Sequence, residues 1–293
     1  MFIFLLLLIF ISSLVVALQY DVVRVVAFVL MGIAMSSTSY IIYYKRLEFL
    51  AAESVHISLF SITLAYIIVY SLTGLQNYLL YTYSVLVVAF INGLLLIYLV
   101  ALMIKRGLSQ EKASAIVVSL TTAFSVIAIQ YALTNMPMQY SLSSIILGEP
   151  LLMRREEALI GVIISLIIVI TTSLLRREIV NTSIDPVSAS LAGVKISLYD
   201  FIIYTLIGVT SIGLLRFAGY VMEHVLMLLP ATITVFYSRN MREHYIGTLV
   251  LGASASAAGF ALSIYLDTPP AGLTGVLMII PLVIGLIREG RYD

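Results

Sequence analysis

The residues of this sequence whose chemistry could bind a ligand are ionisable side chains set inside long apolar runs. Such groups are costly at membrane depth, so each is a functional candidate. Glu53 and His56 stand three residues apart near the start of one run, and a helix would present both on one face. A carboxylate oxygen and an imidazole nitrogen could jointly ligate Zn²⁺, Mn²⁺ or Fe²⁺. The alternative is a polar pair that wets a helix end near the membrane surface.

Glu223 and His224 interrupt a second apolar run. Adjacent residues diverge by about 100° around a helix, so these two cannot both face one small site without help. One alternative for Glu223 is an ion pair with Arg216 near the outer surface. Hydropathy places His56 near the inner surface and Glu223 nearer the outer one. The two pairs are therefore either successive stations of one path or unrelated.

The other ionisable groups beside apolar runs have simpler interpretations. Asp200 is predicted to pair with Lys195 at the membrane interface, and Asp267 to cap or end a helix at the outer face. His244 lies beside Arg239, Arg242 and Glu243 and is predicted to be an ordinary loop histidine on the cytoplasmic side.

The composition requires an integral membrane protein. The chain is 61% hydrophobic and 11% charged, with a mean hydropathy of +1.11, and no soluble domain needs that much apolar surface. All loops are short, so we expect an all-α, polytopic fold that forms one transmembrane domain over residues 1–293. The absence of cysteine excludes disulfides, thiolate metal sites and cysteine nucleophiles.

About ten apolar segments are long enough to span a bilayer, with eight or nine as the alternative count. They cover residues 2–18, 22–44, 55–73, 78–104, 113–133, 158–175, 198–216, 220–237, 246–266 and 272–287. The first lacks a basic leader and a small-residue cleavage site, so we expect a retained helix and not a signal peptide. The pair around Gly219 could be partly re-entrant.

The cationic residues separate cleanly when these spans alternate in direction. One side receives Lys45, Arg46, Lys105, Arg106, Lys112, Arg176, Arg177, Lys195, Arg239, Arg242, Arg288 and Arg291, and the other only Arg24, Arg154, Arg155 and Arg216. Because cytoplasmic loops carry the excess of Lys and Arg, this predicts a multi-pass protein of the cell membrane with both termini in the cytoplasm.

The stretch 183–195 is predicted to form a short helix that does not cross the membrane. Asp185 can cap its first N–H groups, Pro186 suits the first helical position, and Gly193 suits a left-handed residue at its end. About two turns remain, too few to span a bilayer. Leu191 belongs to an apolar stripe at helical spacing. We expect a docking surface at the cytoplasmic face; the alternative is an ordinary interfacial loop helix.

The longest outer segment runs from residue 135 to 157. Its apolar patch, 143–147, is expected to lie on the membrane or re-enter it. The charged cluster formed by Glu149 and residues 154–157 could be a docking surface for a delivering protein. The alternative is a solvated loop whose charges pair with one another.

Four segments, taken in order, resemble motifs in permease subunits of zinc- and manganese-type ABC importers. They are the loop Ile145–Glu149, the coupling stretch Asp185–Gly193, the helix segment Gly219–Thr234, and Ser263–Asp267 with the prolines and glycine that follow. The resemblance runs from about residue 24 to 287.

The candidate ligands fit that family's pattern only in part. His56 matches the histidine of Gly-Asp-x-x-Ser-His, but Ala52 stands at the aspartate and Glu53 comes one residue later. Glu53 could substitute, since spacings of three and four residues both return to one helix face. Glu223 and His224 depart from the family helix, which usually carries small or apolar residues there.

The resemblance implies a permease subunit of an ATP-driven importer for a divalent metal ion, working by alternating access. It also implies a homodimer with the path at its two-fold axis, two ABC ATP-binding subunits below and a solute-binding protein outside. No phosphate-binding Gly-x-x-x-x-Gly-Lys-Ser/Thr motif occurs, so ATP is expected to be hydrolysed in the partner, and this chain is not expected to be an enzyme. Membrane lipid is the other expected partner, and nucleic acid is not one.

Three other functions stay open. A permease for a metal chelate, such as a siderophore, haem or cobalamin, is compatible with the missing aspartate. A secondary transporter that works without an ATPase would need buried acidic relays and no docking helix. An intramembrane enzyme would need paired catalytic groups, and none of the usual motifs is complete.

Overall fold

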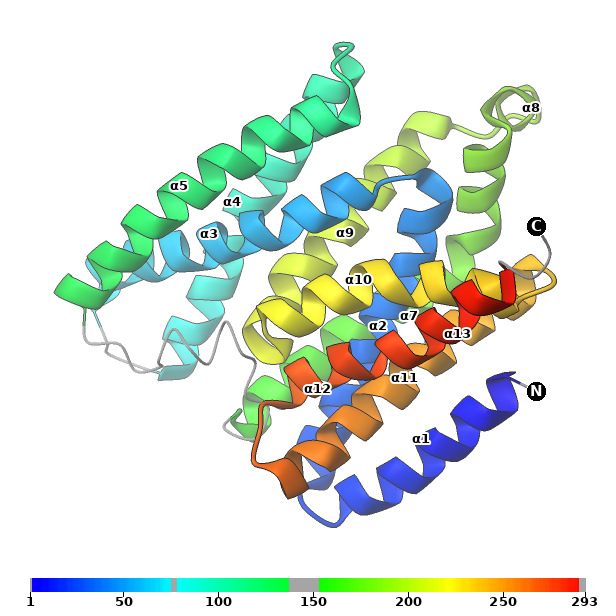
Figure 1. The fold of residues 1–293 in the computed structure, drawn as a ribbon. Coiled ribbons are helices and arrows are strands. Elements are labelled where there is room, and N and C mark those ends of the chain that lie inside the picture. The colour runs from blue at the N-terminus through cyan, green and yellow to red at the C-terminus, as the bar shows by residue number, and fades with distance from the viewer. Residues whose placement is uncertain (1, 75–77, 137–152, 290–293) are drawn as a thin grey trace.

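The computed structural model describes residues 2–74, 78–136 and 153–289. In these ranges the chain is a bundle of α-helices without strands (Figure 1). Nine helical segments are long and apolar enough to cross a membrane, and α1 is a further, shorter apolar helix. The all-α, polytopic fold is thus confirmed for the described residues; the nine long helices agree with the alternative count of eight or nine, and α1 would be the tenth.

The helices follow the predicted spans closely. Their bounds are α1 Phe2–Leu18, α2 Val22–Lys45, α3 Glu48–Thr73, α4 Tyr78–Lys105, α5 Gln110–Asn135, α7 Arg155–Ile184, α8 Pro186–Leu191, α9 Ile196–Ala218, α10 Tyr220–Thr234, η1 Val235–Tyr237, α11 Met241–Leu266, α12 Pro270–Leu277 and α13 Ile279–Glu289. The largest difference is α7, which continues past the predicted end at residue 175. Its Arg176 guanidinium lies over the Tyr245 ring, 4.6 Å from the centroid, so the charge does not end the helix.

Capping residues set several of these boundaries. The Asp21 carboxylate accepts hydrogen bonds from two N–H groups of α2, and Asn240 accepts one from Glu243 N–H at 2.9 Å. Asp267 ends α11 in a left-handed conformation with φ 49°, in agreement with the predicted helix end.

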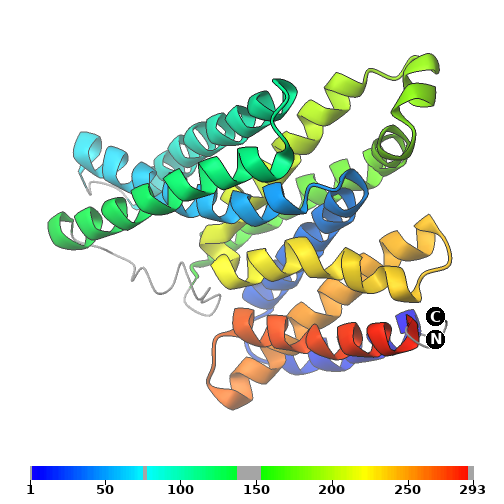
Figure 2. The same cartoon turned by 45° about the horizontal axis from the view of Figure 1, so that its top comes forward.

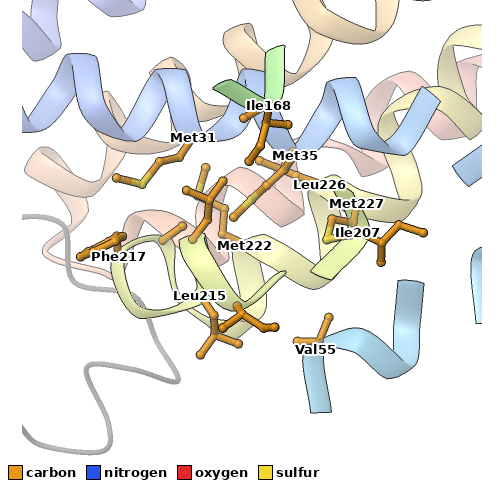
Figure 3. Packing of buried hydrophobic residues seen from close by; sticks show 14 of the residues in the cluster. Met31, Met35, Val55, Ile168, Ile207, Leu215, Phe217, Met222, Leu226 and Met227 are labelled. Carbon is orange, nitrogen blue, oxygen red and sulfur yellow. The ribbon is translucent and has the colours of Figure 1, made fainter. Parts of the chain in front are cut away.

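The core is centred on α2, which packs against α7, α10 and α11. Side chains from α2, α7 and α10 point toward one another there, including Met31, Met35, Ile168 and Leu226 (Figure 3). The small-residue segment Gly252–Gly259 of α11 is buried. A Cβ on Gly252 would collide with the Ser36 hydroxyl of α2. The segment therefore serves close helix packing.

The helices α3, α4 and α5 form the other part of the bundle, with α3 between α5 and α9. Figures 1 and 2 both show α5 at the outer edge, lying along α3. In both views, α8 projects beyond the bundle on the same side as the start of α1 and the end of α13.

The predicted partner of Asp200 is wrong. The Lys45 ammonium at the end of α2 lies 2.8 Å from its carboxylate. Lys195, the expected partner, immediately precedes the first turn of α9. The pairing follows from the packing of α2 against α9, which sequence proximity does not reveal.

His244 is not the loop residue that the sequence predicted. Because α11 begins at Met241, five residues before the predicted start, His244 lies inside the helix and is buried. Its Nε2 is 2.8 Å from the Ala231 carbonyl oxygen and its Nδ1 is 3.1 Å from the Tyr44 hydroxyl. Both ring nitrogens therefore have protein partners.

Candidate functional site

His56 lies where three helices meet. Its Nε2 is 3.2 Å from the hydroxyl of Tyr220 on α10, and its Nδ1 is 3.3 Å from the hydroxyl of Thr122 on α5. Sequence reasoning missed both partners. A neutral imidazole has one N–H donor and one lone pair, so whichever nitrogen accepts does so from a hydroxyl.

Tyr220 joins the two candidate histidines. Its ring is 5.7 Å from the His56 ring in an edge arrangement and 6.0 Å from the His224 ring, which is nearly parallel to it. Tyr220 and His224 are four residues apart on α10 and so share a face. This four-residue spacing is the sequence signal from which the contact between Tyr220 and His224 could have been predicted.

The predicted separation in depth between His56 and the α10 pair is therefore wrong. Hydropathy treated the turn at Gly219 as an outer surface turn. Phe217 and Ala218, the last residues of α9, are buried in the protein, so α10 begins inside the bundle within reach of α3.

Glu223 lies next to His224 in sequence and one helical turn from Tyr220 on α10. It is fully buried, and neither carboxyl oxygen has a hydrogen-bond partner in the described part of the chain. Ser211 of α9 lies beside it. A carboxylate there needs a proton or a cation, because an unpaired buried charge costs several kcal/mol.

The alternative ion pair between Glu223 and Arg216 is wrong. The Arg216 guanidinium pairs with Glu157 of α7 at 2.7 Å, and these side chains are only 6% and 5% exposed. Glu157 was predicted to belong to a charged cluster that faces outside. It is instead buried inside the bundle, where its carboxylate pairs with Arg216. The apolar patch 143–147 and Glu149 lie outside the described residues.

Glu53 is on α3, and its side chain lies in the contact between α3 and α5. Its side chain is 2% exposed and lies beside Ser114 of α5, and neither carboxyl oxygen has a hydrogen-bond partner among the described residues. Glu53 and His56 both approach α5, as the three-residue spacing predicted.

The four candidate ligands do not form one compact metal site. Within the described ranges, no group of three or more His, Asp or Glu residues could hold a metal ion together. His56 and His224 are joined through Tyr220, whereas Glu53 and Glu223 occupy separate buried positions. The arrangement offers several single ligands along the contacts of α3, α5 and α10.

The exposed surface of α5 has two different sides. One carries large apolar residues, namely Ile116, Leu120, Phe124 and Ile127. The other is mixed: it carries Ala115, Ser119, Thr122 and Gln130 together with the exposed Val126 and Leu133. Since Thr122 contacts His56, the second side adjoins the histidine group.

The short helix predicted after α7 is present as α8. Asp185 accepts a hydrogen bond from the Ser188 N–H at 2.9 Å, Pro186 occupies the first position, and Gly193 follows with φ 82°. Hydrogen bonds from Ser188 hold the pKa of the Asp185 carboxyl below its usual value. Val187 and Leu191 are 67% and 84% exposed, so the apolar stripe of α8 is uncovered in the protomer.

A bundle of membrane-length helices with ionisable side chains inside it and a capped helix projecting from one end defines a polytopic membrane protein. Residues 18–289 match the model of the ABC 3 transport family, and the chain belongs to that family. The match confirms the ABC permease resemblance drawn from the sequence motifs. This is a permease family, and the chain is a multi-pass membrane protein.

Curated relatives and solved structures agree with this assignment. A "Probable metal transport system membrane protein" of Thermotoga maritima is 23% identical over 230 residues, covering 78% of this chain and 76% of that protein. The "Manganese import system permease protein ScaB" of Streptococcus gordonii is 22% identical over 115 residues, covering 39% of this chain and 41% of that protein.

Two solved structures share the fold. PsaBC from Streptococcus pneumoniae in complex with Fab matches with a TM-score of 0.76 at 17% identity, over 94% of this chain and 95% of that one. An inward-facing conformation of a putative metal-chelate type ABC transporter matches with a TM-score of 0.73 at 15% identity, over 98% of each chain.

Proposed function

We propose that this chain is the membrane permease subunit of an ATP-driven importer for a divalent metal ion, Zn²⁺, Mn²⁺ or Fe²⁺. The observation that carries the proposal is the group formed by His56, Tyr220 and His224 inside a family fold whose named relatives transport metals. Imidazole nitrogens are suitable ligands for these metals at membrane depth. The metal is the transported substrate and not a resident cofactor.

The metal path in this proposal runs along the contacts of α10 with α3 and α5. Glu53, His56, Glu223 and His224 act as successive stations and not as one closed site. Sequential weak ligation suits transport, since a passenger held by a complete ligand set would leave slowly. The two unpaired buried carboxyls supply the negative charge that a passing cation needs.

The functional unit in this proposal is a homodimer with the path between protomers. The mixed side of α5 supports it through Ala115, Ser119 and Thr122, because small residues let helices approach closely and polar groups are disfavoured against lipid tails. A second copy would cover this side and enclose His56. Ile116, Leu120, Phe124 and Ile127, on the other side, would remain in contact with membrane lipid.

The coupling element in this proposal is α8. Asp185, Pro186 and Gly193 fix its ends, and Leu191 with its uncovered stripe docks a separate ABC ATP-binding subunit on the cytoplasmic side. Both chain termini lie on that side, and a solute-binding protein delivers metal at the opposite face. Nucleotide-driven movement of α8 then shifts the bundle between inward- and outward-open populations.

A metal chelate is the second candidate substrate. The absence of a three-residue metal cluster in the described chain favours it, because a chelate brings its own metal ligands. The aspartate of the metal-ion pattern is also replaced by Ala52.

The deciding experiment is ATP-dependent uptake into vesicles that contain the permease, its ATPase and its binding protein. Mn²⁺, Zn²⁺, Fe²⁺ and an iron chelate are offered to the parent, Glu53→Ala and His56→Ala. Glu48→Ala is the matched control, since Glu48 is an exposed carboxylate on the same helix. We expect metal uptake to fall only in the first two variants. Intact metal uptake in both would remove the path assignment, and uptake of the chelate alone would favour the second candidate.

A further inference from the structure

The hydroxyl of Tyr220 is hydrogen-bonded to Nε2 of His56, the ring nitrogen that a metal ion would use. His56 Nε2 is 3.2 Å from this hydroxyl, and the other ring nitrogen is held by Thr122. A metal ion at Nε2 would sit about 2.0–2.1 Å from the nitrogen, in the space between the two groups. A metal ion binds through the nitrogen lone pair, so the hydrogen bond between Nε2 and the hydroxyl has to break before a metal ion can bind there.

The backbone has a break directly before Tyr220, at which α10 can change its direction relative to α9. Gly219 separates α9 from α10 with φ 87°, a conformation that residues with a side chain rarely adopt. On one side of this break, Arg216 anchors α9 to Glu157 of α7. On the other side, Tyr220 is the first residue of α10.

The far end of α10 also has a break. Pro230 lies inside the helix and has no N–H to continue the backbone ladder. The α10 segment between Gly219 and Pro230 is therefore bounded by two positions at which a helix can bend. His56 is carried by α3, so a rotation of this segment changes the distance from Tyr220 to His56 without unfolding either helix.

We propose that Tyr220 is a gate for the His56 site: its hydroxyl blocks the Nε2 of His56 in the present conformation and leaves when α10 moves. The inference rests on the proposed function, because it assumes that His56 meets a metal ion. It adds a residue that lies outside the metal-ion pattern and gives the site a closed state. The Tyr220 ring also stacks on His224, so release of His56 repositions the second histidine.

The test uses diethyl pyrocarbonate, which modifies neutral imidazole nitrogens. The chain has three histidines, so mass spectrometry of the full-length protein in lipid nanodiscs reports each of them. The key variant, Tyr220→Phe, keeps the ring and removes only the hydroxyl. Tyr220 is half-buried, so this loss of one oxygen preserves the fold. Tyr204→Phe on α9 is the matched control, and His244 is the internal reference because both of its nitrogens are bonded.

We expect Tyr220→Phe to raise the modification rate of His56 by about two- to tenfold, the size set by one neutral hydrogen bond. Tyr204→Phe should leave that rate unchanged. Added Mn²⁺ should protect His56, with half-protection in Tyr220→Phe at a concentration lower by a similar factor. Zn²⁺ is the second probe.

The outcomes that overturn the gate differ from those that overturn the proposed function. Equal modification rates, or equal half-protection concentrations in parent and variant, overturn the gate and leave the metal path standing. Weaker protection in Tyr220→Phe makes Tyr220 a ligand and overturns the gate. If neither metal protects His56 in any variant, the metal assignment of His56 fails and the gate fails with it.

Discussion

The exposed stripe of α8 gives the sharpest prediction about subunit assembly. Leu191 is 84% exposed in the protomer, so nearly all of its surface is available to a docking partner. Burying a Leu side chain contributes about 1.5–3 kcal/mol. Replacing Leu191 by serine should therefore weaken binding of the ATPase subunit by about 10- to 150-fold at 25 °C. Folding should be unaffected, because the side chain loses almost no contact within the protomer.

The assay is the dissociation constant of the ATPase subunit for the permease in lipid nanodiscs, measured by a surface or fluorescence method. The matched control is Leu174→Ser on α7, where a leucine is 72% exposed in a membrane-spanning helix away from α8. Val187→Ser, on the same stripe as Leu191, should weaken binding in the same direction.

An unchanged dissociation constant in both α8 variants would refute the reasoning, since it would leave the uncovered stripe without a partner. An equal loss in Leu174→Ser would refute it as well, because binding would then depend on general perturbation of the bundle.

Three further predictions concern stability. Arg216→Met should lower the free energy of unfolding by about 3–5 kcal/mol, because it removes the guanidinium that lies 2.7 Å from the buried Glu157 carboxylate; adding Glu157→Gln should recover much of this loss in thermal unfolding, and no recovery would contradict the pairing. Gly252→Ala should cost about 1–3 kcal/mol by the same measurement, since its Cβ would collide with Ser36; an unchanged melting temperature would show that the helices can separate freely there. The pKa of Asp185 is lowered by the folded cap, so the cap stabilises α8 above the unfolded pKa of about 3.9 and loses its effect as pH falls through the folded value. Hydrogen exchange of the Ser188 amide should show this loss below about pH 4 in the parent but not in Asp185→Asn, and identical pH profiles would contradict it.

Local signals in the sequence were sufficient for the helices and for α8. Asp185, Pro186 and Gly193 each impose a backbone conformation on their own neighbourhood, so their order alone predicts a short capped helix. Hydropathy likewise predicted the spans. Hydropathy predicted the end of α7 too early, because it scores Arg176 as a polar residue. In the structure the Arg176 guanidinium lies over the Tyr245 ring, and the helix continues.

The contacts that define the candidate site could not be predicted in the same way. His56 and Tyr220 are 164 residues apart, and Lys45 and Asp200 are 155 apart. Such pairs depend on which helices pack together and at what depth. Helical periodicity in the sequence gives neither the packing partner nor the depth. The buried turn after α9 illustrates this, because its sequence reads as an outer surface loop although its residues lie inside the protein.

The mixed side of α5 also bears on how the proposed homodimer would be made. A newly inserted protomer presents Ser119 and Gln130 to hydrocarbon, and their side-chain hydrogen bonds are made within their own helix. In the proposed homodimer a second copy, met by diffusion in the membrane, would cover this side. Slow synthesis would then leave solitary copies waiting longer, exposed to membrane proteases and to mispairing with other helices. Under that proposal, expression level becomes a determinant of the yield of assembled protein.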